Sequence, residues 1–203
     1  MISPDPIAAL RQATGAQHDI LDTGLPLALP DAGLPAYISH LQMLSAWLRP
    51  IEAWLSQFND GPQQPGLLPT VDRLALIDAD LRAAGAAAPP MAGGAGWPAG
   101  ASAAYRWGVA YVVEGSQLGG AVLYKRLAGP LAPHPLAYLK PGADGPGPRW
   151  RLVMAALREQ VRSETELADA CAGARDAFDR ILALGRPATV EPQPMCAAGA
   201  ARL

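Results

Sequence analysis

Residues 111–120 read YVVEGSQLGG and place three glycines, Gly115, Gly119 and Gly120, inside a long apolar helical pattern. Glycine in a helix interior costs roughly 0.5–1 kcal/mol relative to alanine. Three of them within six residues therefore indicate that the helix bends, or that another group approaches its backbone closely. A flat ligand lying on the helix would account for both, and a close crossing with a second helix is the alternative.

The rest of the chain alternates helical periodicity with proline and glycine, and it has no sustained alternation of the kind that strands show. This pattern predicts an all-α, single-domain helical bundle over residues 1–184, with Thr70 capping the third helix and Ser163 with Glu166 opening the sixth. The expected helices cover residues 7–21, 35–58, 70–84, 102–127, 148–162 and 164–184. Residues 185–203 are rich in proline, alanine and glycine, so we expect a disordered tail there.

Composition narrows the function classes before any motif does. The 203-residue chain carries a net charge of -2, which gives no reason to expect a nucleic-acid partner and favours a small-molecule site. Its N-terminus lacks a basic region followed by an apolar run, and the uncharged residues 83–105 are alanine, glycine and proline, typical of a connector. With only two cysteines, the chain is expected in the reducing cytoplasm, without a membrane span.

Three segments together resemble the heme oxygenases, especially their bacterial biliverdin-producing branch. They are LRQATGAQH at residues 10–18, EGSQLGG at residues 114–120 and GARDAF at residues 173–178. The resemblance covers roughly residues 7–184 and implies that heme lies between the first, proximal helix and the glycine-kinked distal helix. It also implies that heme b, as both substrate and cofactor, is cleaved with O2 to biliverdin, ferrous iron and carbon monoxide.

The same resemblance implies partners. Electrons would come from an external donor, a ferredoxin or a flavoprotein reductase, because the sequence shows no nicotinamide or flavin fingerprint of its own. A bacteriophytochrome is a candidate acceptor of the biliverdin. Two other functions stay open: a non-catalytic heme carrier or sensor, and a degenerate helical protein that serves only for interaction.

His18 is the candidate axial ligand of the heme iron, since it lies on the inward face of the first helix. Asp22 follows one turn later on the same face and can hold the other ring nitrogen. The resemblance assigns these roles to both residues. The alternative is that His18 is a hydrogen-bonded core histidine. His40 and His134 have no partners at metal-site spacing and are not expected to act.

On the distal side, Gly115, Gly119 and Gly120 would let the helix backbone lie against the porphyrin, where a Cβ atom would collide with the ring or with bound oxygen. The animal enzymes have an aspartate after the first of these glycines, whereas this chain has Ser116. Three candidates therefore remain for the group that anchors the distal water: the Ser116 hydroxyl, Glu114 and backbone carbonyls.

Heme propionates need cations at the mouth of the pocket. The resemblance points to Arg11 and Arg175, and Lys125 is a competing anchor. Each of the three could instead be an ordinary solvated surface residue. If Arg11 and Arg175 hold the propionates, we predict cleavage at the α meso carbon. If Lys125 holds them, the heme would be rotated and another meso carbon would be cleaved.

Overall fold

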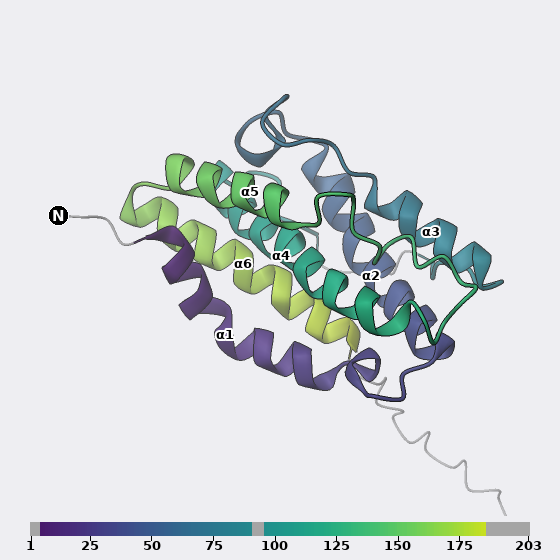
Figure 1. Ribbon diagram of the computed structural model, residues 1–203. Helices are drawn as coiled ribbons and strands as arrows, with labels where there is room; N and C mark the ends of the chain where they lie inside the picture. The colour runs from purple at the N-terminus through teal and green to yellow at the C-terminus, as the bar shows by residue number, and fades with distance from the viewer. Residues whose placement is uncertain (1–4, 91–95, 186–203) are drawn as a thin grey trace, which may run out of the picture.

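The computed structural model describes residues 5–90 and 96–185, and the regular structure within these ranges is entirely helical (Figure 1). The predicted all-α fold is confirmed. The α-helices are α1 (Pro6–Gly24), α2 (Leu34–Leu55), α3 (Arg73–Ala83), α4 (Ala103–Leu127), α5 (Gly147–Gln160) and α6 (Glu164–Gly185), with short 3-10 helices η1 (Pro26–Ala28) and η2 (Gly61–Gln63). Residues 186–203, nearly all of the expected tail, lie outside the described ranges.

Side chains cap the starts of α3, α4 and α6, and the cap of α3 corrects the sequence prediction. The third helix begins at Arg73 rather than at Thr70, because the Asp72 side chain accepts a hydrogen bond from the Ala75 amide at 2.9 Å and so caps the first turn. At the start of α6, the Ser163 hydroxyl accepts from the Glu166 amide while the Glu166 carboxylate accepts from the Ser163 amide. This reciprocal cap confirms the prediction for the sixth helix.

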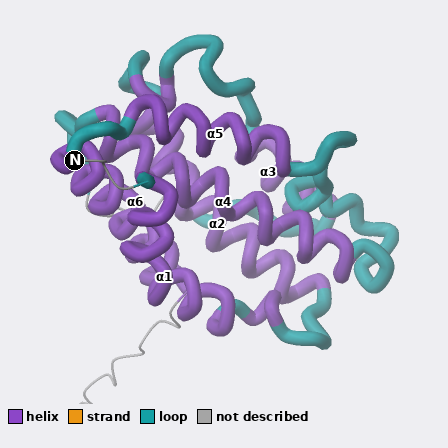
Figure 2. The backbone as a smooth tube through the Cα atoms, turned by 60° about the vertical axis from the view of Figure 1, so that its left-hand side comes forward, coloured by secondary structure: helices purple, strands orange, loops and turns teal. Residues whose placement is uncertain are grey.

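α6 is the central support of the bundle. Both α1 and α4 pack along it, α2 lies across it, α3 packs on α2, and α5 covers α4 (Figures 1 and 2). α1 and α4 therefore contact α6 far more than they contact each other. None of the helices in the described part of the chain is both long and apolar enough to cross a membrane.

The crossing of α4 and α6 depends on two glycines. A Cβ atom on Gly108 would lie 1.9 Å from the Ala170 carbonyl oxygen, and one on Gly173 would lie 2.0 Å from the Tyr105 carbonyl oxygen. No side chain fits at such distances, so the two backbones touch directly. The sequence offered a close helix crossing as the alternative explanation for the glycines of residues 111–120. Such a crossing exists, but Gly108 and Gly173 make it, and Gly108 precedes that segment on α4.

A buried carboxylate fixes the chain that follows α4. Asp80 of α3 accepts hydrogen bonds from the Tyr37 hydroxyl at 2.7 Å and from the amides of Ala137 and Tyr138 at 2.8 Å each. The His134 ring lies 3.0 Å from the Asp80 carbonyl oxygen and accepts from the Leu136 amide, which makes it a structural residue. These contacts hold residues 134–139 against α2 and α3.

Candidate functional site

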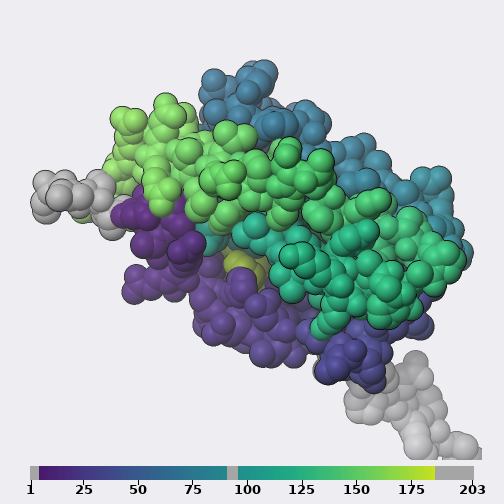
Figure 3. Space-filling view, viewed as in Figure 1, coloured from purple at the N-terminus to yellow at the C-terminus, as the bar shows by residue number. Residues whose placement is uncertain are grey.

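A cavity of about 670 Å³ lies between α1 and α4, and side chains of α2 and α6 form its floor. Its volume falls within the range of roughly 300–1,000 Å³ typical of small-molecule sites. Figure 3 shows the hollow between the purple α1 and the teal and green atoms of α4 and α5, with α6 visible inside it. The wall is largely apolar and includes Leu44, Trp47, Leu123, Phe178 and Ile181.

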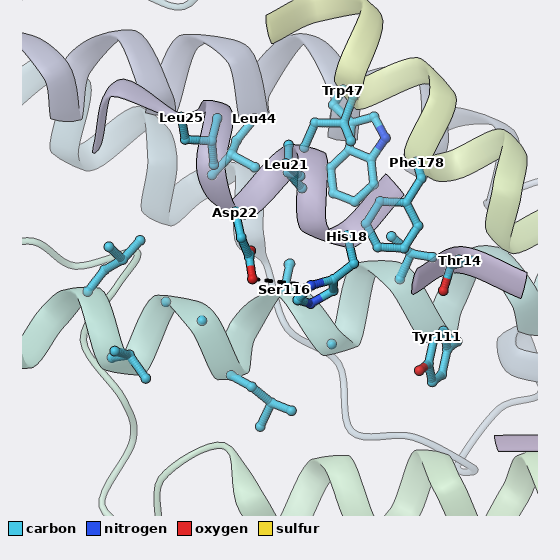
Figure 4. Close-up of a pocket in the computed structure, with 18 of the residues that line it drawn as sticks. Thr14, His18, Leu21, Asp22, Leu25, Leu44, Trp47, Tyr111, Ser116 and Phe178 are labelled. Atoms are coloured by element: carbon cyan, nitrogen blue, oxygen red, sulfur yellow. Dashed lines mark ion pairs between the residues drawn. The ribbon is translucent and has the colours of Figure 1, made fainter. Parts of the chain in front are cut away.

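His18 and Asp22 lie on the α1 side of this cavity (Figure 4). His18 Nδ1 is 3.2 Å from Asp22 Oδ2, and the two side chains are 60% and 64% exposed. The alternative of a core histidine therefore does not describe His18. Because Asp22 engages Nδ1, the Nε2 atom is the nitrogen left for a ligand in the cavity.

The three glycines of the 111–120 segment face this cavity from α4 and leave space in it. A Cβ atom on Gly119 would meet no atom within 4 Å, and those on Gly115 and Gly120 would reach only Trp150 at 3.7 Å and Leu139 at 3.5 Å. These are ordinary contacts or open space, so a helix crossing does not explain these glycines. α4 runs through them as one continuous helix.

Ser116 lies between these glycines in the cavity wall and belongs to a small polar group. Its hydroxyl donates to the Val113 carbonyl at 2.7 Å, so its oxygen is left to accept. Gln117 donates to the Tyr138 hydroxyl at 2.9 Å and lies 3.4 Å from Ser116 Oγ. Burial raises the pKa of Tyr138, so its hydroxyl keeps its proton and has it to donate.

Glu114, also a candidate catalytic residue from the sequence, is not part of this group. It does not line the cavity; it is buried on another face of α4, where Arg149 donates to both of its oxygens at 2.6 and 2.7 Å and Arg73 lies 2.7 Å away. Burial alone would raise the pKa of Glu114, but the two arginines outweigh it and lower the pKa. Helical rotation explains the difference, because adjacent residues point about 100° apart.

Among the three propionate candidates, Arg11 alone lines the cavity in the described part of the chain. Burial raises the pKa of Tyr111, which faces it from α4, and the nearby Arg11 guanidinium opposes that rise. Arg175 instead donates to the Ala13 carbonyl at 3.3 Å and ties α6 to α1. Lys125 is exposed near the end of α4, beyond the cavity wall.

The cavity wall also contains residues that the sequence did not single out as site residues, among them Tyr111, Tyr138 and His40, which was not expected to act. His40 Nδ1 is buried without a hydrogen-bond partner, and burial lowers the pKa of His40 to about 4. Tyr111 was visible in the glycine segment, one turn before Gly115, which puts it on the same face. Tyr138 carried no local signal, because Asp80 brings its loop to the cavity from another part of the sequence.

No family model matches this sequence. A curated heme oxygenase from Xanthomonas campestris pv. campestris (strain 8004) is 39% identical over 112 residues, which cover 52% of this chain and 62% of that protein. The match thus spans less than two thirds of the relative's length. The solved heme oxygenase of Neisseria meningitidis, described with NO and CO bound, superposes with a TM-score of 0.70 at 24% identity, covering 95% of this chain and 99% of that one.

The chain has the heme oxygenase fold. The resemblance predicted from its three sequence segments is thereby confirmed. Around the cavity of this chain, a histidine on α1 lies opposite a glycine-rich stretch of α4.

The residues of the cavity fit heme. His18 offers a ring nitrogen, and the glycines opposite it leave an open backbone surface on which a flat macrocycle can lie. The apolar floor suits the porphyrin, while Arg11 supplies a cation for a carboxylate.

Proposed function

We propose that this protein is a heme oxygenase that cleaves heme to biliverdin, ferrous iron and carbon monoxide, using O2 and external electrons. One observation carries the proposal: the His18–Asp22 pair and the unhindered glycine surface of α4 line the same cavity. A carrier would need the histidine, but it would have no evident use for an open surface on the side where oxygen must bind.

His18 would hold the iron through Nε2, and Asp22 would fix the ring's tautomer and orientation through Nδ1. Heme itself supplies the oxidative chemistry when bound, while the protein supplies geometry and hydrogen bonds. Gly115, Gly119 and Gly120 would keep side chains away from the space above the ring.

Arg11 and Tyr111 would receive a propionate at the mouth of the cavity, since they lie close together and belong to helices on its two sides. A guanidinium binds a carboxylate through charge-assisted hydrogen bonds. Arg175 would act indirectly, by holding α1 in place through the Ala13 carbonyl.

Ser116 and Tyr138 would anchor the distal water. Ser116 Oγ has its proton on the Val113 carbonyl and already interacts with Gln117 and with the Tyr138 hydroxyl, so a water that joined this group would donate to Ser116 and accept from Tyr138. A water held between an acceptor and a donor is oriented, which is what proton delivery requires.

The deciding experiment is turnover of hemin by the purified protein with ascorbate or a ferredoxin–reductase pair. We expect loss of the heme absorption band and appearance of biliverdin, and we expect His18→Ala to lose the axial imidazole spectrum and most of the turnover. A stable heme complex without product would favour the carrier or sensor, and failure to bind hemin would favour the interaction protein.

The identity of the electron donor, a bacteriophytochrome as acceptor of biliverdin, a cytoplasmic location and cleavage at the α position remain predictions from the sequence resemblance. Product analysis in the same experiment tests the last of these. A product dominated by the β or δ isomer would contradict it.

A further inference from the structure

His40 is a polar side chain of the heme-sized cavity that the proposed reaction does not use. It lies on α2, which together with α6 forms the cavity floor. The other side chains that these two helices contribute to the wall are Leu44, Trp47, Phe178 and Ile181. His40 is therefore an imidazole in a floor of large apolar groups.

Neither nitrogen of the His40 ring has a hydrogen-bond partner among the described residues. Nδ1 is buried, so no ligand reaches it. Nε2 is not enclosed in this way, and the residue as a whole keeps some accessible surface. Burial nevertheless lowers the pKa of His40 to about 4, which places the ring deep in the protein. Its accessible surface therefore belongs to the cavity that it lines.

The two surroundings decide which nitrogen of the neutral ring carries the proton. A proton on Nδ1 would be a buried donor without an acceptor, an arrangement that native proteins rarely contain. A proton on Nε2 points to the cavity, where a ligand can accept it. His40 thus offers the cavity one hydrogen-bond donor, the Nε2–H group.

The chemistry of heme limits what this donor can meet. Heme offers hydrogen-bond acceptors only at its propionates and at the ligand on its iron. In the proposed seating the propionates lie at the mouth beside Arg11, and the α meso carbon is on the opposite edge of the ring. That edge would face the floor, and in heme it consists of carbon and hydrogen alone. The substrate therefore gives His40 no acceptor.

Cleavage at the α position changes this edge of the ligand. In biliverdin, the two pyrrole carbons that flanked the lost meso carbon each carry a carbonyl oxygen, which accepts hydrogen bonds. We propose that His40 is a product-binding residue, whose Nε2–H group donates to a terminal carbonyl oxygen of biliverdin. This inference rests on the proposed function, and it gives a role to the one polar side chain of the described floor.

The test compares how the heme-free full chain binds hemin and biliverdin IXα, each followed by quenching of tryptophan fluorescence. His40→Leu replaces the ring by an apolar side chain and removes the donor. We expect its Kd for biliverdin to rise roughly three- to tenfold, as for the loss of one hydrogen bond, and its Kd for hemin to stay unchanged or fall. Gln42→Leu, a polar-to-apolar change on the same helix but outside the wall, is the matched control and should alter neither.

His40→Gln provides a second comparison, because the side-chain amide keeps an N–H donor. This variant should retain most of the biliverdin affinity that His40→Leu loses. In the wild-type protein, NMR of the histidine side chains should find the His40 proton on Nε2 and a shift of its signal when biliverdin is added. The NMR measurement decides the question even if His40→Leu does not fold.

The role of His40 would be refuted by an equal change in the two Kd values of His40→Leu, by a proton on Nδ1, or by an Nε2–H signal that bound biliverdin leaves in place. None of these results affects the proposed function, provided that the wild-type protein binds hemin and converts it to biliverdin. A wild-type protein that does not bind hemin would instead contradict the proposed function, and the role of His40 with it.

Discussion

Gly108 and Gly119 lie on the same face of α4, because eleven residues make about three turns of a helix. At Gly108 that face is pressed against the Ala170 carbonyl of α6, whereas at Gly119 it borders open space. One residue type thus brings two helices together at one position and keeps a cavity open three turns later.

The same substitution should therefore have opposite effects at these two glycines. Gly108→Ala forces a Cβ atom into the backbone of α6 and should destabilise the fold by about 1–3 kcal/mol or more. Gly119→Ala should stabilise the heme-free protein by up to about 1 kcal/mol, because alanine favours the helix and meets nothing there. Chemical denaturation of both variants measures these changes.

At Gly119 a larger side chain should impair heme binding rather than folding. Gly119→Val should fold yet bind heme or oxygen poorly, since the branched side chain occupies the space against which the ring would lie. Wild-type hemin affinity and oxygen binding in the folded variant would show that the ligand lies elsewhere.

Asp22→Asn should leave His18 able to bind iron but change the character of the bond. The carboxylate 3.2 Å from Nδ1 is a stronger hydrogen-bond acceptor than a neutral amide, so it would make the ring the stronger electron donor to iron. We expect a lower iron–histidine stretching frequency in resonance Raman spectra and a slower turnover. Asp19→Asn is the control, because Asp19 directly follows His18 and lies in the same cavity wall but is not paired with His18. An equal change in that variant would show that Asp22 has no special role.

Arg11→Ala should weaken hemin binding by tenfold or more and broaden the distribution of biliverdin isomers, because a charge-assisted contact is worth roughly 1.5–3 kcal/mol. Lys125→Ala should change neither, since Lys125 lies outside the cavity wall. Hemin titration and chromatography of the product test both variants. An isomer switch in Lys125→Ala with none in Arg11→Ala would reverse the assignment.

His40 should make the protein sensitive to mild acid. Its pKa is about 4 in the fold against an ordinary 6.5, so the unfolded chain takes up a proton first as the pH falls. The stability due to neutral His40 is complete above pH 6.5 and declines toward pH 4. Between pH 7 and 4.5, His40→Gln should lose roughly 2–3 kcal/mol less than the wild type in urea titrations. Parallel curves for the two proteins would contradict this.

Local sequence patterns predicted the helices and the residues of α1 and α4 that line the cavity. Helical geometry alone predicts that His18 and Asp22 share a face and that the glycines lie along one side of their helix. The structure has both groups at these places, lining the cavity. Thr70 failed as a cap because Asp72, two residues later, competes for the same role with a carboxylate.

Residues placed by distant contacts could not be found in this way. Tyr138 reaches the cavity because Asp80, far earlier in the chain, binds its amide. Helical rotation alone puts Glu114 on another face of α4 than Gly115, but its pairing there with Arg73 and Arg149, which come from two other helices, could not be read from the sequence. Arg175 matched a sequence pattern, yet its partner is a backbone carbonyl of α1.

The dependence of both α1 and α4 on α6 has a thermodynamic consequence. The two walls of the cavity, α1 and α4, make few direct contacts with each other. A ligand that contacts both helices would therefore add packing interactions between them that the protein alone does not make. Its binding energy is added to the free energy of unfolding and grows with the logarithm of its concentration above Kd. The substrate of this protein would thus also be part of its hydrophobic core, and each catalytic cycle would remove a piece of that core.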